Sequence, residues 1–237
     1  MRELLYLAGH TLKDDGKRRW FEQDEGDERL TQDRALIRGD YPGLKYGLNH
    51  AGRKVFLDGA IILRAECGIP TRVKTRVVFP DSYPELEPMA FETGNMFPRI
   101  ADRHFFLDGG CCLWLPVESQ WKPRASMGLH DFLDHVSTFY ERQLIYEASP
   151  DKHWAWGERG HGIAGYIEFV QETLGEDASL ASNFVGLLSG KEEIEPASSC
   201  PCKSSKKFKH CHAKRLIKLI ERLGKHNPFV SSHRLPT

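Results

Sequence analysis

The 237-residue sequence has no excess of charge of either sign, no long apolar run and no internal repeat. Its 33 Lys and Arg residues balance its 33 Asp and Glu residues, and a formal net charge of +0 argues against a chain-wide nucleic-acid or membrane surface. No stretch approaches the ~20 apolar residues that span a bilayer, and residues 1–20 have no secretory-signal pattern. The sequence therefore predicts a soluble, cytoplasmic protein with no membrane partner.

The sequence has few cysteines, and most of them lie in two clusters. The six cysteines are Cys67, Cys111, Cys112, Cys200, Cys202 and Cys211. A chain of this length can bury a full core without disulfides, and thiols in the cytosol stay reduced. Clustered thiols in such a chain indicate catalysis or metal binding. Cys67, outside both clusters, is interpreted as a small buried hydrophobe.

Strand-like segments come first along the chain, and helix-like segments follow. Residues 72–79 alternate apolar and basic side chains with a period of two, which is typical of a half-buried strand. Residues 54–63 and 89–93 are further apolar segments of strand length. Grouped strands followed by grouped helices predict an α+β domain with an antiparallel sheet of about four strands.

Three segments have helical patterns: residues 27–38, a segment beginning at Leu129, and residues 162–176. The second has one apolar stripe, formed by Leu129, Phe132, Leu133, Val136 and Tyr140. The third is expected to turn one face inward, formed by Ile163, Tyr166, Ile167, Val170 and Leu174. These helices are expected to flank the sheet.

Residues 76–123 contain the most informative order of residues in the chain. Along it stand Phe79-Pro80, Tyr83-Pro84, Pro88, His104, Gly109, Cys112-Leu113, Trp121 and Pro123. This order resembles the catalytic stretch of the ubiquitin-conjugating (UBC) fold, and the resemblance covers roughly residues 27–145. It implies a transferase that carries the C-terminus of a ubiquitin-like or other cargo protein as a thioester on Cys112. An activating enzyme is implied as a second partner.

Two neighbouring cysteines compete for the acceptor position. A thioester carrier needs a reachable, partly ionised thiol on an extended segment with little bulk beside it, and Gly109 and Gly110 are expected to leave room for a cargo tail. Neighbours in an extended segment point to opposite sides. The family spacing places Cys112 at the acceptor position and Cys111 at the preceding apolar position. The alternative, that both are small buried hydrophobes, stays open.

The sequence departs from the resemblance at one catalytic position. The family's His-Pro-Asn is His104-Phe105-Phe106 here, so the His is matched and the Asn is not. That Asn is thought to steady the oxyanion formed when an amine attacks the thioester. Its absence argues against lysine-directed transfer, unless backbone N–H groups of residues 108–112 or another donor take its role. Prokaryotic members often lack the Asn too, and many belong to antiviral defence operons, so the resemblance implies such a setting.

Three side chains are candidates for moving a proton during the reaction. His104 is the candidate that the resemblance supplies, although a His at the edge of a sheet more often holds a loop by hydrogen bonds. Glu118 and Asp151 are candidates for deprotonating an attacking amine. Their spacing in the sequence does not decide between them.

The most specific motif is CPCKSSKKFKHCH, residues 200–212, which resembles the SEC-C motif. Three thiols and one imidazole, from Cys200, Cys202, Cys211 and His212, match a closed tetrahedral Zn²⁺ site. Full ligation with no open position indicates a structural metal. So few residues cannot bury a core, so the metal is expected to hold this knuckle together.

A basic amphipathic helix is expected behind the knuckle. Residues 200–225 contain nine Lys and Arg residues against one acid, Glu221. Such density suits a nucleic acid or an acidic protein face, and it also suits a solvated helix that packs on the knuckle. Beside the transferase, two further functions therefore stay open: a non-catalytic UBC-fold interaction module and a nucleic-acid adaptor.

The same patterns predict the domain organisation. The boundaries expected are an extension over 1–26, a UBC-like domain with C-terminal helices over 27–190, a polar linker over 191–199 and a zinc-binding tail over 200–237. The linker is expected to separate two cores, so metal loss is expected to unfold the tail alone.

Overall fold

The computed structural model describes residues 21, 24–49, 54–63, 70–115, 118, 121, 128–154, 159–161, 163–175 and 177–223. The chain forms two compact units. The sheet unit comprises Met1–Leu113 and Gln120–Trp154, and the knuckle unit comprises Trp114–Ser119 and Ala155–Thr237. This division does not follow the expected boundaries, because helices assigned to the first domain belong to the same unit as the cysteine-rich tail. Cys67 lies outside the described residues.

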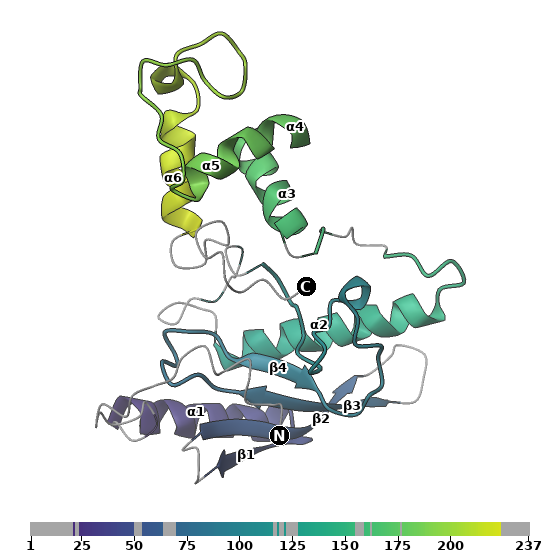
Figure 1. The fold of residues 1–237 in the computed structure, drawn as a ribbon. Helices are drawn as coiled ribbons and strands as arrows, with labels where there is room; N and C mark the ends of the chain where they lie inside the picture. Colours follow the sequence, from purple (N-terminus) through teal and green to yellow (C-terminus); the bar gives the residue numbers. More distant parts are fainter. Residues whose placement is uncertain are drawn as a thin grey trace. The chain divides into compact units, whose positions relative to one another are not determined.

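The sheet unit contains a four-stranded antiparallel sheet in the order β1-β2-β3-β4 (Figure 1). The strands are β1 (Leu44–Asn49), β2 (Lys54–Leu63), β3 (Thr71–Val78) and β4 (Met89–Glu92). This architecture confirms the predicted α+β class and strand number. No separate prediction covered β1, whose sequence LKYGLN mixes charged, polar and glycine residues and becomes a strand by pairing with β2.

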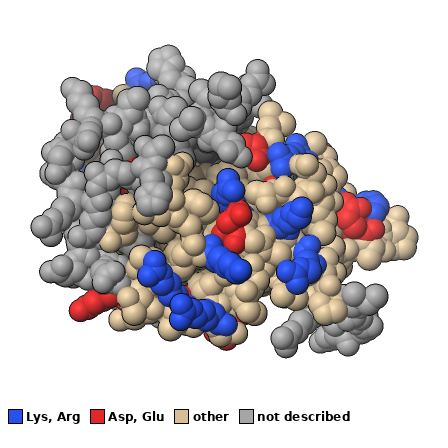
Figure 2. All heavy atoms as spheres, turned by 90° about the horizontal axis from the view of Figure 1, so that it is seen from below, with Lys and Arg blue, Asp and Glu red and all other residues tan. Residues whose placement is uncertain are grey.

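The alternation within β3 separates a buried face from an open one. Val73, Thr75 and Val77 are fully buried, whereas Arg72 and Lys74 are exposed. The opposite faces of a pleated strand produce this pattern. On the face seen from below, Lys and Arg side chains gather over the described surface, with fewer Asp and Glu side chains among them (Figure 2).

Helices α1 (Asp24–Asp40) and α2 (Leu129–Ala148) cover the buried face of the sheet. Tyr140 of α2 accepts a 3.4 Å hydrogen bond from Thr75 of β3, and Arg34 of α1 lies over the ring of Tyr46 in β1. The predicted stripe of α2 is buried along its whole length. A period of 3.6 residues therefore located this helix correctly.

A buried polar cluster joins α1 to the segment between β3 and β4. Tyr83 donates a 3.1 Å hydrogen bond to Asp33, and the same carboxylate accepts from Arg29 at 3.2 Å. Burial raises the pKa of Asp33, although Arg29 and Tyr83 oppose the shift. The cluster fixes the Tyr83-Pro84 turn, whose Pro84 carbonyl accepts a 2.8 Å hydrogen bond from the Trp121 indole.

The knuckle unit has its own helical core. Its elements are α3 (Ile163–Leu174), α4 (Ala178–Ala181), η4 (Ser182–Phe184), α5 (Val185–Leu188), η5 (Phe208–His210) and α6 (Ala213–Leu223). The predicted face of α3 is partly wrong: Ile163 is 40% exposed, and Phe169, at 2% exposed, packs in the core instead. Among the described residues, no helix has both the length and the apolarity needed to cross a membrane.

Candidate thiol site and metal centre

The segment that contains the paired cysteines is held by backbone hydrogen bonds on both sides. The N–H of Cys111 donates to the Ala90 carbonyl of β4 at 2.9 Å. The N–H of Cys112 donates to the His104 carbonyl at 2.8 Å. Consecutive N–H groups that donate in different directions are the mark of an extended segment. The two thiols therefore project from a fixed backbone toward opposite sides.

The two thiols have different surroundings. The Cys111 sulfur donates to the hydroxyl of fully buried Tyr140 at 3.6 Å, and burial raises the pKa of Cys111 to about 12. Burial also raises the pKa of Cys112, a half-buried residue. Both thiols are therefore protonated at neutral pH. Cys111 faces the core, which leaves Cys112 as the thiol on the other side of the segment.

The two glycines before the cysteines, Gly109 and Gly110, allow neighbouring parts of the sheet unit to pack closely. Both are buried, and Gly109 has a left-handed φ of 89°. A Cβ at Gly109 would lie 2.5 Å from the carbonyl oxygen of Glu92, and one at Gly110 would lie 3.1 Å from the Phe106 ring. The close approach that requires glycine here is to the protein's own strand and loop. The expectation that these glycines open a path for cargo does not fit this packing.

The backbone N–H groups suggested as oxyanion donors are already engaged. Gly109 donates to Phe106 at 2.9 Å, Gly110 donates to the Asp108 carboxylate at 2.9 Å, and Cys111 and Cys112 donate as described above. Four of the five N–H groups of residues 108–112 are thus used inside the protein. These four groups could replace the family's Asn only if their present hydrogen bonds were given up, so this replacement stays a prediction. Phe106 itself, at the Asn position, has no side-chain donor.

His104 holds this segment mainly through its backbone. Its φ of 53° is left-handed, its N–H donates to Ala101 at 2.7 Å, and its carbonyl accepts from Cys112. Its ring packs edge-on against Trp154, with ring centroids 5.6 Å apart. These contacts favour the structural role over proton transfer. The catalytic role of His104 stays a prediction.

The two candidate carboxylates have other partners. Glu118 accepts from the Arg159 guanidinium at 2.9 Å within the knuckle unit. Asp151 accepts from the Ser149 hydroxyl, and this hydrogen bond lowers the pKa of the carboxyl. A carboxylate with a lowered pKa is a weak general base. Neither arrangement supports deprotonation of an attacking amine.

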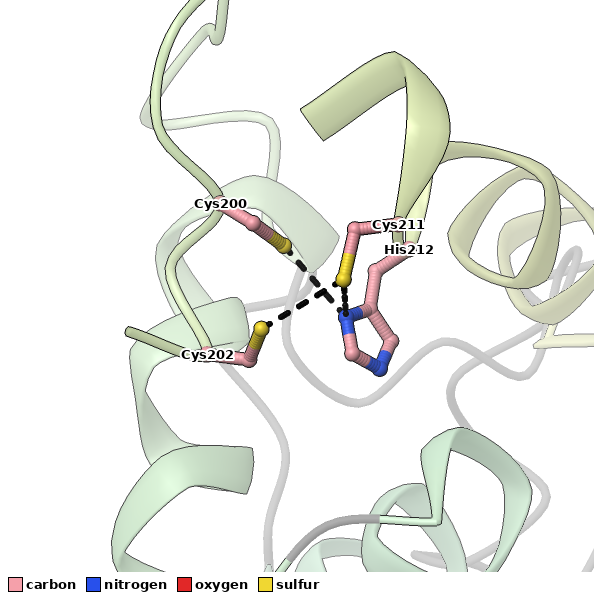
Figure 3. Close-up of side chains that lie close together, drawn as sticks. All are labelled: Cys200, Cys202, Cys211 and His212. Atoms are coloured by element: carbon pink, nitrogen blue, oxygen red, sulfur yellow. Dashed lines mark hydrogen bonds between the residues drawn. The ribbon is translucent and has the colours of Figure 1, made fainter. Parts of the chain in front are cut away.

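The four metal-binding candidates of the tail lie together (Figure 3). Their sulfur and nitrogen atoms all lie within 4.8 Å of one another. His212 Nδ1 lies 3.3 Å from the Cys200 sulfur and 3.2 Å from the Cys211 sulfur, and the sulfurs of Cys202 and Cys211 are 3.5 Å apart. Bonds of about 2.3 Å to sulfur and about 2.0 Å to nitrogen give tetrahedral edges of about 3.5–3.8 Å. The cluster can therefore bind a metal ion.

Ser204 supports this cluster, and the sequence patterns did not single it out. Its hydroxyl lies 3.0 Å from the Cys202 sulfur and 3.4 Å from the Cys211 sulfur. Such outer contacts orient the groups that bind a metal. Although burial opposes ionisation, hydrogen bonds from Ser204 and the neighbouring thiols lower the pKa of Cys202 to about 6. A sulfur that ionises easily suits metal binding.

The metal centre is part of a larger apolar core. Cys200, Cys202 and Phe208 are buried in one cluster with residues of α3, α5 and α6. The ring of His212 packs against Phe184, with centroids 5.2 Å apart. The knuckle therefore does not rely on a metal alone for its packing. This arrangement differs from the expectation of an isolated motif behind a linker.

A second group of possible metal-binding atoms lies at the start of α2, formed by His130, Asp131 and Asp134. The two imidazole nitrogens of His130 already face carboxylates, at 3.1 Å from Asp134 and 3.3 Å from Asp40. The Asp131 carboxylate accepts from the N–H of Gly128 at the helix start. Through the contacts of His130, this group forms a polar link between α1 and α2.

Comparison with solved structures gives distant likenesses. The chain is similar to the yeast Vps23 UEV domain in complex with a Vps27 PSDP peptide, at 16% identity and a TM-score of 0.35, over 49% of this chain and 81% of that chain. It is also similar to the Vps23 UEV in a complex with ubiquitin, at 15% identity and a TM-score of 0.35, over 51% of this chain and 85% of that chain. No family model and no curated protein matches it. Likenesses of this size carry no argument about activity.

Proposed function

We propose that this protein is a ubiquitin-conjugating-like transferase that accepts the C-terminus of a cargo protein as a thioester on Cys112. The observation that carries the proposal is the placement of two adjacent thiols on a fixed, extended segment. The Cys111 thiol is hydrogen-bonded to Tyr140 in the core, whereas Cys112 is half-buried on the other side of the extended segment. The order of residues around Cys112, which resembles the ubiquitin-conjugating fold, supports the same assignment.

The proposed transfer has two balanced steps. In the first, the Cys112 sulfur attacks the carbonyl carbon of a cargo C-terminus held as a thioester on an activating enzyme. A carbon–sulfur bond to Cys112 forms, the bond to the activating enzyme breaks, and the proton of Cys112 passes to the departing thiol. In the second, an amine of a target attacks the carbonyl carbon, the carbon–nitrogen bond forms, the carbon–sulfur bond to Cys112 breaks, and the departing Cys112 sulfur takes up the proton that the amine loses.

The first step is expected to depend on a base from outside the segment, because burial keeps the Cys112 thiol protonated at neutral pH. The second step lacks a clear donor for the oxyanion, since Phe106 stands at the Asn position and neighbouring N–H groups are engaged. A long-lived thioester follows from the second of these features, whereas the first slows its formation. We place the reaction in the cytoplasm, and the resemblance favours an antiviral defence system as its setting.

Replacing Phe106 by asparagine is expected to speed discharge of the thioester to free lysine by about tenfold, below the full effect of a well-aligned oxyanion donor. Phe106 is half-buried beside Gly110, so an amide here lies close to the cysteine segment. A chase of preformed thioester with lysine measures the rate. Leu107→Asn is the matched control, because Leu107 is 83% exposed and the added amide faces solvent. Equal rates for Phe106→Asn and wild type would contradict this account.

A metal ion suits the knuckle, and we propose that it is zinc with a structural role. Cys200, Cys202, Cys211 and His212 would hold it, and three thiolates with one imidazole leave no open position for a substrate. When bound, the ion supplies crosslinking and no catalysis. The four residues tie the turn at residues 200–202 to the start of α6.

The basic surface of the knuckle unit is proposed to bind an acidic partner, either a nucleic acid or an acidic protein face. Its members are exposed: Lys203, Lys206, Lys207, Lys209, Lys214 and Lys218. If the partner is a nucleic acid, affinity for a labelled oligonucleotide is expected to fall at least about tenfold between 50 and 200 mM salt, because binding releases counterions. Lys214→Gln with Lys218→Gln is expected to flatten that slope, as anisotropy titrations would show. Absent or salt-independent binding would favour the acidic protein.

The proposed transfer is tested with a candidate activating enzyme and cargo protein. A higher-mass adduct on non-reducing gels that collapses with thiol reductant supports it. The competing function is a non-catalytic interaction module, which the protonated thiols and the missing oxyanion donor favour. Binding of the cargo without any adduct would establish the module instead.

A further inference from the structure

The face of the sheet opposite α1 and α2 has a strong positive charge, although the chain as a whole is balanced. Along each strand, side chains of this outer face alternate with the buried ones. Asp58 is the one acid that the four strands place there, because Glu92 is buried on the other face. Five cations share the outer face, and we call them the basic sheet face: Lys45 of β1, Lys54 of β2, and Arg72, Lys74 and Arg76 of β3.

The register of the strands brings these charges together. Lys45, Asp58 and Arg76 are opposite one another on three neighbouring strands, and residues so placed lie side by side on one face. Arg72, Lys74 and Arg76 recur at every second residue of β3, which spaces them about 6.7 Å apart along the strand. Asp58 accepts a 3.0 Å hydrogen bond from Arg76 and balances that one charge. No acid of the strands' outer face balances the other four.

Two phenylalanine rings lie on the same face as these cations. Phe56 of β2 and Phe91 of β4 are both half-buried, and Phe91 is directly opposite Arg76. The Arg76 guanidinium lies 5.3 Å from the centroid of the Phe56 ring, a cation–π contact. A Cβ at Gly47 would lie 2.4 Å from the Phe56 ring, so this ring packs on the backbone of β1. The outer face thus presents aromatic rings and positive charges at fixed places.

We propose that the basic sheet face, with Phe56 and Phe91, binds a single-stranded nucleic acid. Regularly spaced cations suit a phosphate backbone, and the rings offer unpaired bases a surface on which to stack. Four-stranded sheets with exposed aromatic side chains bind single strands in this way. An acidic protein has no bases to stack on these rings. The site goes beyond the proposed transfer, and it uses other residues than the basic surface of the knuckle unit.

The test is the binding of fluorescein-labelled oligo-dT of about 20 nucleotides to the full chain, measured by anisotropy over a range of salt concentrations. Arg72→Gln with Lys74→Gln is expected to weaken binding about tenfold at about 100 mM salt. The slope of log affinity against log salt is expected to fall by about 1.4, since each lost phosphate contact removes about 0.7. Arg38→Gln with Arg142→Gln is the matched control, because it removes two exposed cations from α1 and α2. It is expected to leave affinity and slope unchanged.

A second variant separates stacking from charge. Phe56→Leu keeps an apolar side chain over Gly47 and removes the ring, so it is expected to weaken binding at least about fivefold. The salt slope is expected to stay unchanged, because stacking releases no counterions. Photocrosslinking with iodouracil in the oligonucleotide then locates the strand, and mass spectrometry is expected to find the adduct on peptides that contain Phe56 or Phe91.

Three outcomes would overturn the proposal. The first is wild-type affinity and salt slope in the Arg72→Gln, Lys74→Gln variant, with its fold verified by circular dichroism. The second is crosslinking confined to residues 200–223. The third is tighter binding to polyglutamate or to vesicles of anionic lipid than to oligo-dT, which would assign the face to an acidic protein or to a membrane. No readout needs cargo or Cys112, so the result is independent of the proposed thioester.

Discussion

Cys112→Ser is expected to abolish the reductant-sensitive adduct with cargo, or to replace it by an adduct that reductant does not cleave. A serine oxygen forms an ester in place of the thioester, and esters resist thiol reductants. The change is all-or-none because no other group of the segment offers an equivalent sulfur on the same side. Non-reducing gels with and without reductant, run with activating enzyme and cargo, provide the measurement.

Cys111→Ser is the matched control, because it changes the adjacent thiol by the same atom. The adduct is expected to persist, since the Cys111 thiol donates a hydrogen bond to the buried Tyr140 hydroxyl and faces the core. If Cys111→Ser alone destroys the adduct in a folded protein, the acceptor is Cys111 and the assignment is displaced by one residue. If neither substitution matters and no adduct forms with the correct partner, the interaction module is the better account.

Replacing Cys200 and Cys202 together by serine is expected to reduce bound zinc from about one equivalent to near zero, because two of four metal-binding atoms are lost. The purified variant and wild type are compared by elemental analysis. Ser198→Ala with Ser199→Ala is the matched double control, as both serines are exposed beside the site. Equal zinc in the cysteine variant and wild type would rule out this metal centre.

The structural consequence of zinc loss is expected to extend beyond the tail. Cys200 and Cys202 are buried with Phe169 and Leu174 of α3, so their cluster and the helix share one core. Loss of a structural zinc removes several kcal/mol of folding free energy from such a unit. Hydrogen exchange is expected to speed up in α3 and α6 and to stay slow in α2. Fast exchange confined to residues 200–223 would restore the original expectation of an independent tail.

Local patterns located the elements whose burial follows a simple period. The stripe of α2 and the alternation of β3 each point one face at the core, and each was read correctly from spacing. The strand β1 and the short helices α4 and α5 have weak periods, and they exist because neighbouring elements pair or pack with them. Ile163 shows the same limit, since helical spacing placed it inward and the tertiary packing leaves it exposed.

The sequence by itself determined the chemistry of this protein: which thiols are adjacent, which residue stands in place of the Asn, and which four side chains suit a metal ion. These properties depend on residue type and spacing along the chain. Only the tertiary structure decided which thiol faces Tyr140, that the neighbouring N–H groups are engaged, and that Arg159 joins Glu118 to α3 across 41 residues. Burial and hydrogen bonding between distant segments arise when the chain packs, and no local pattern encodes them.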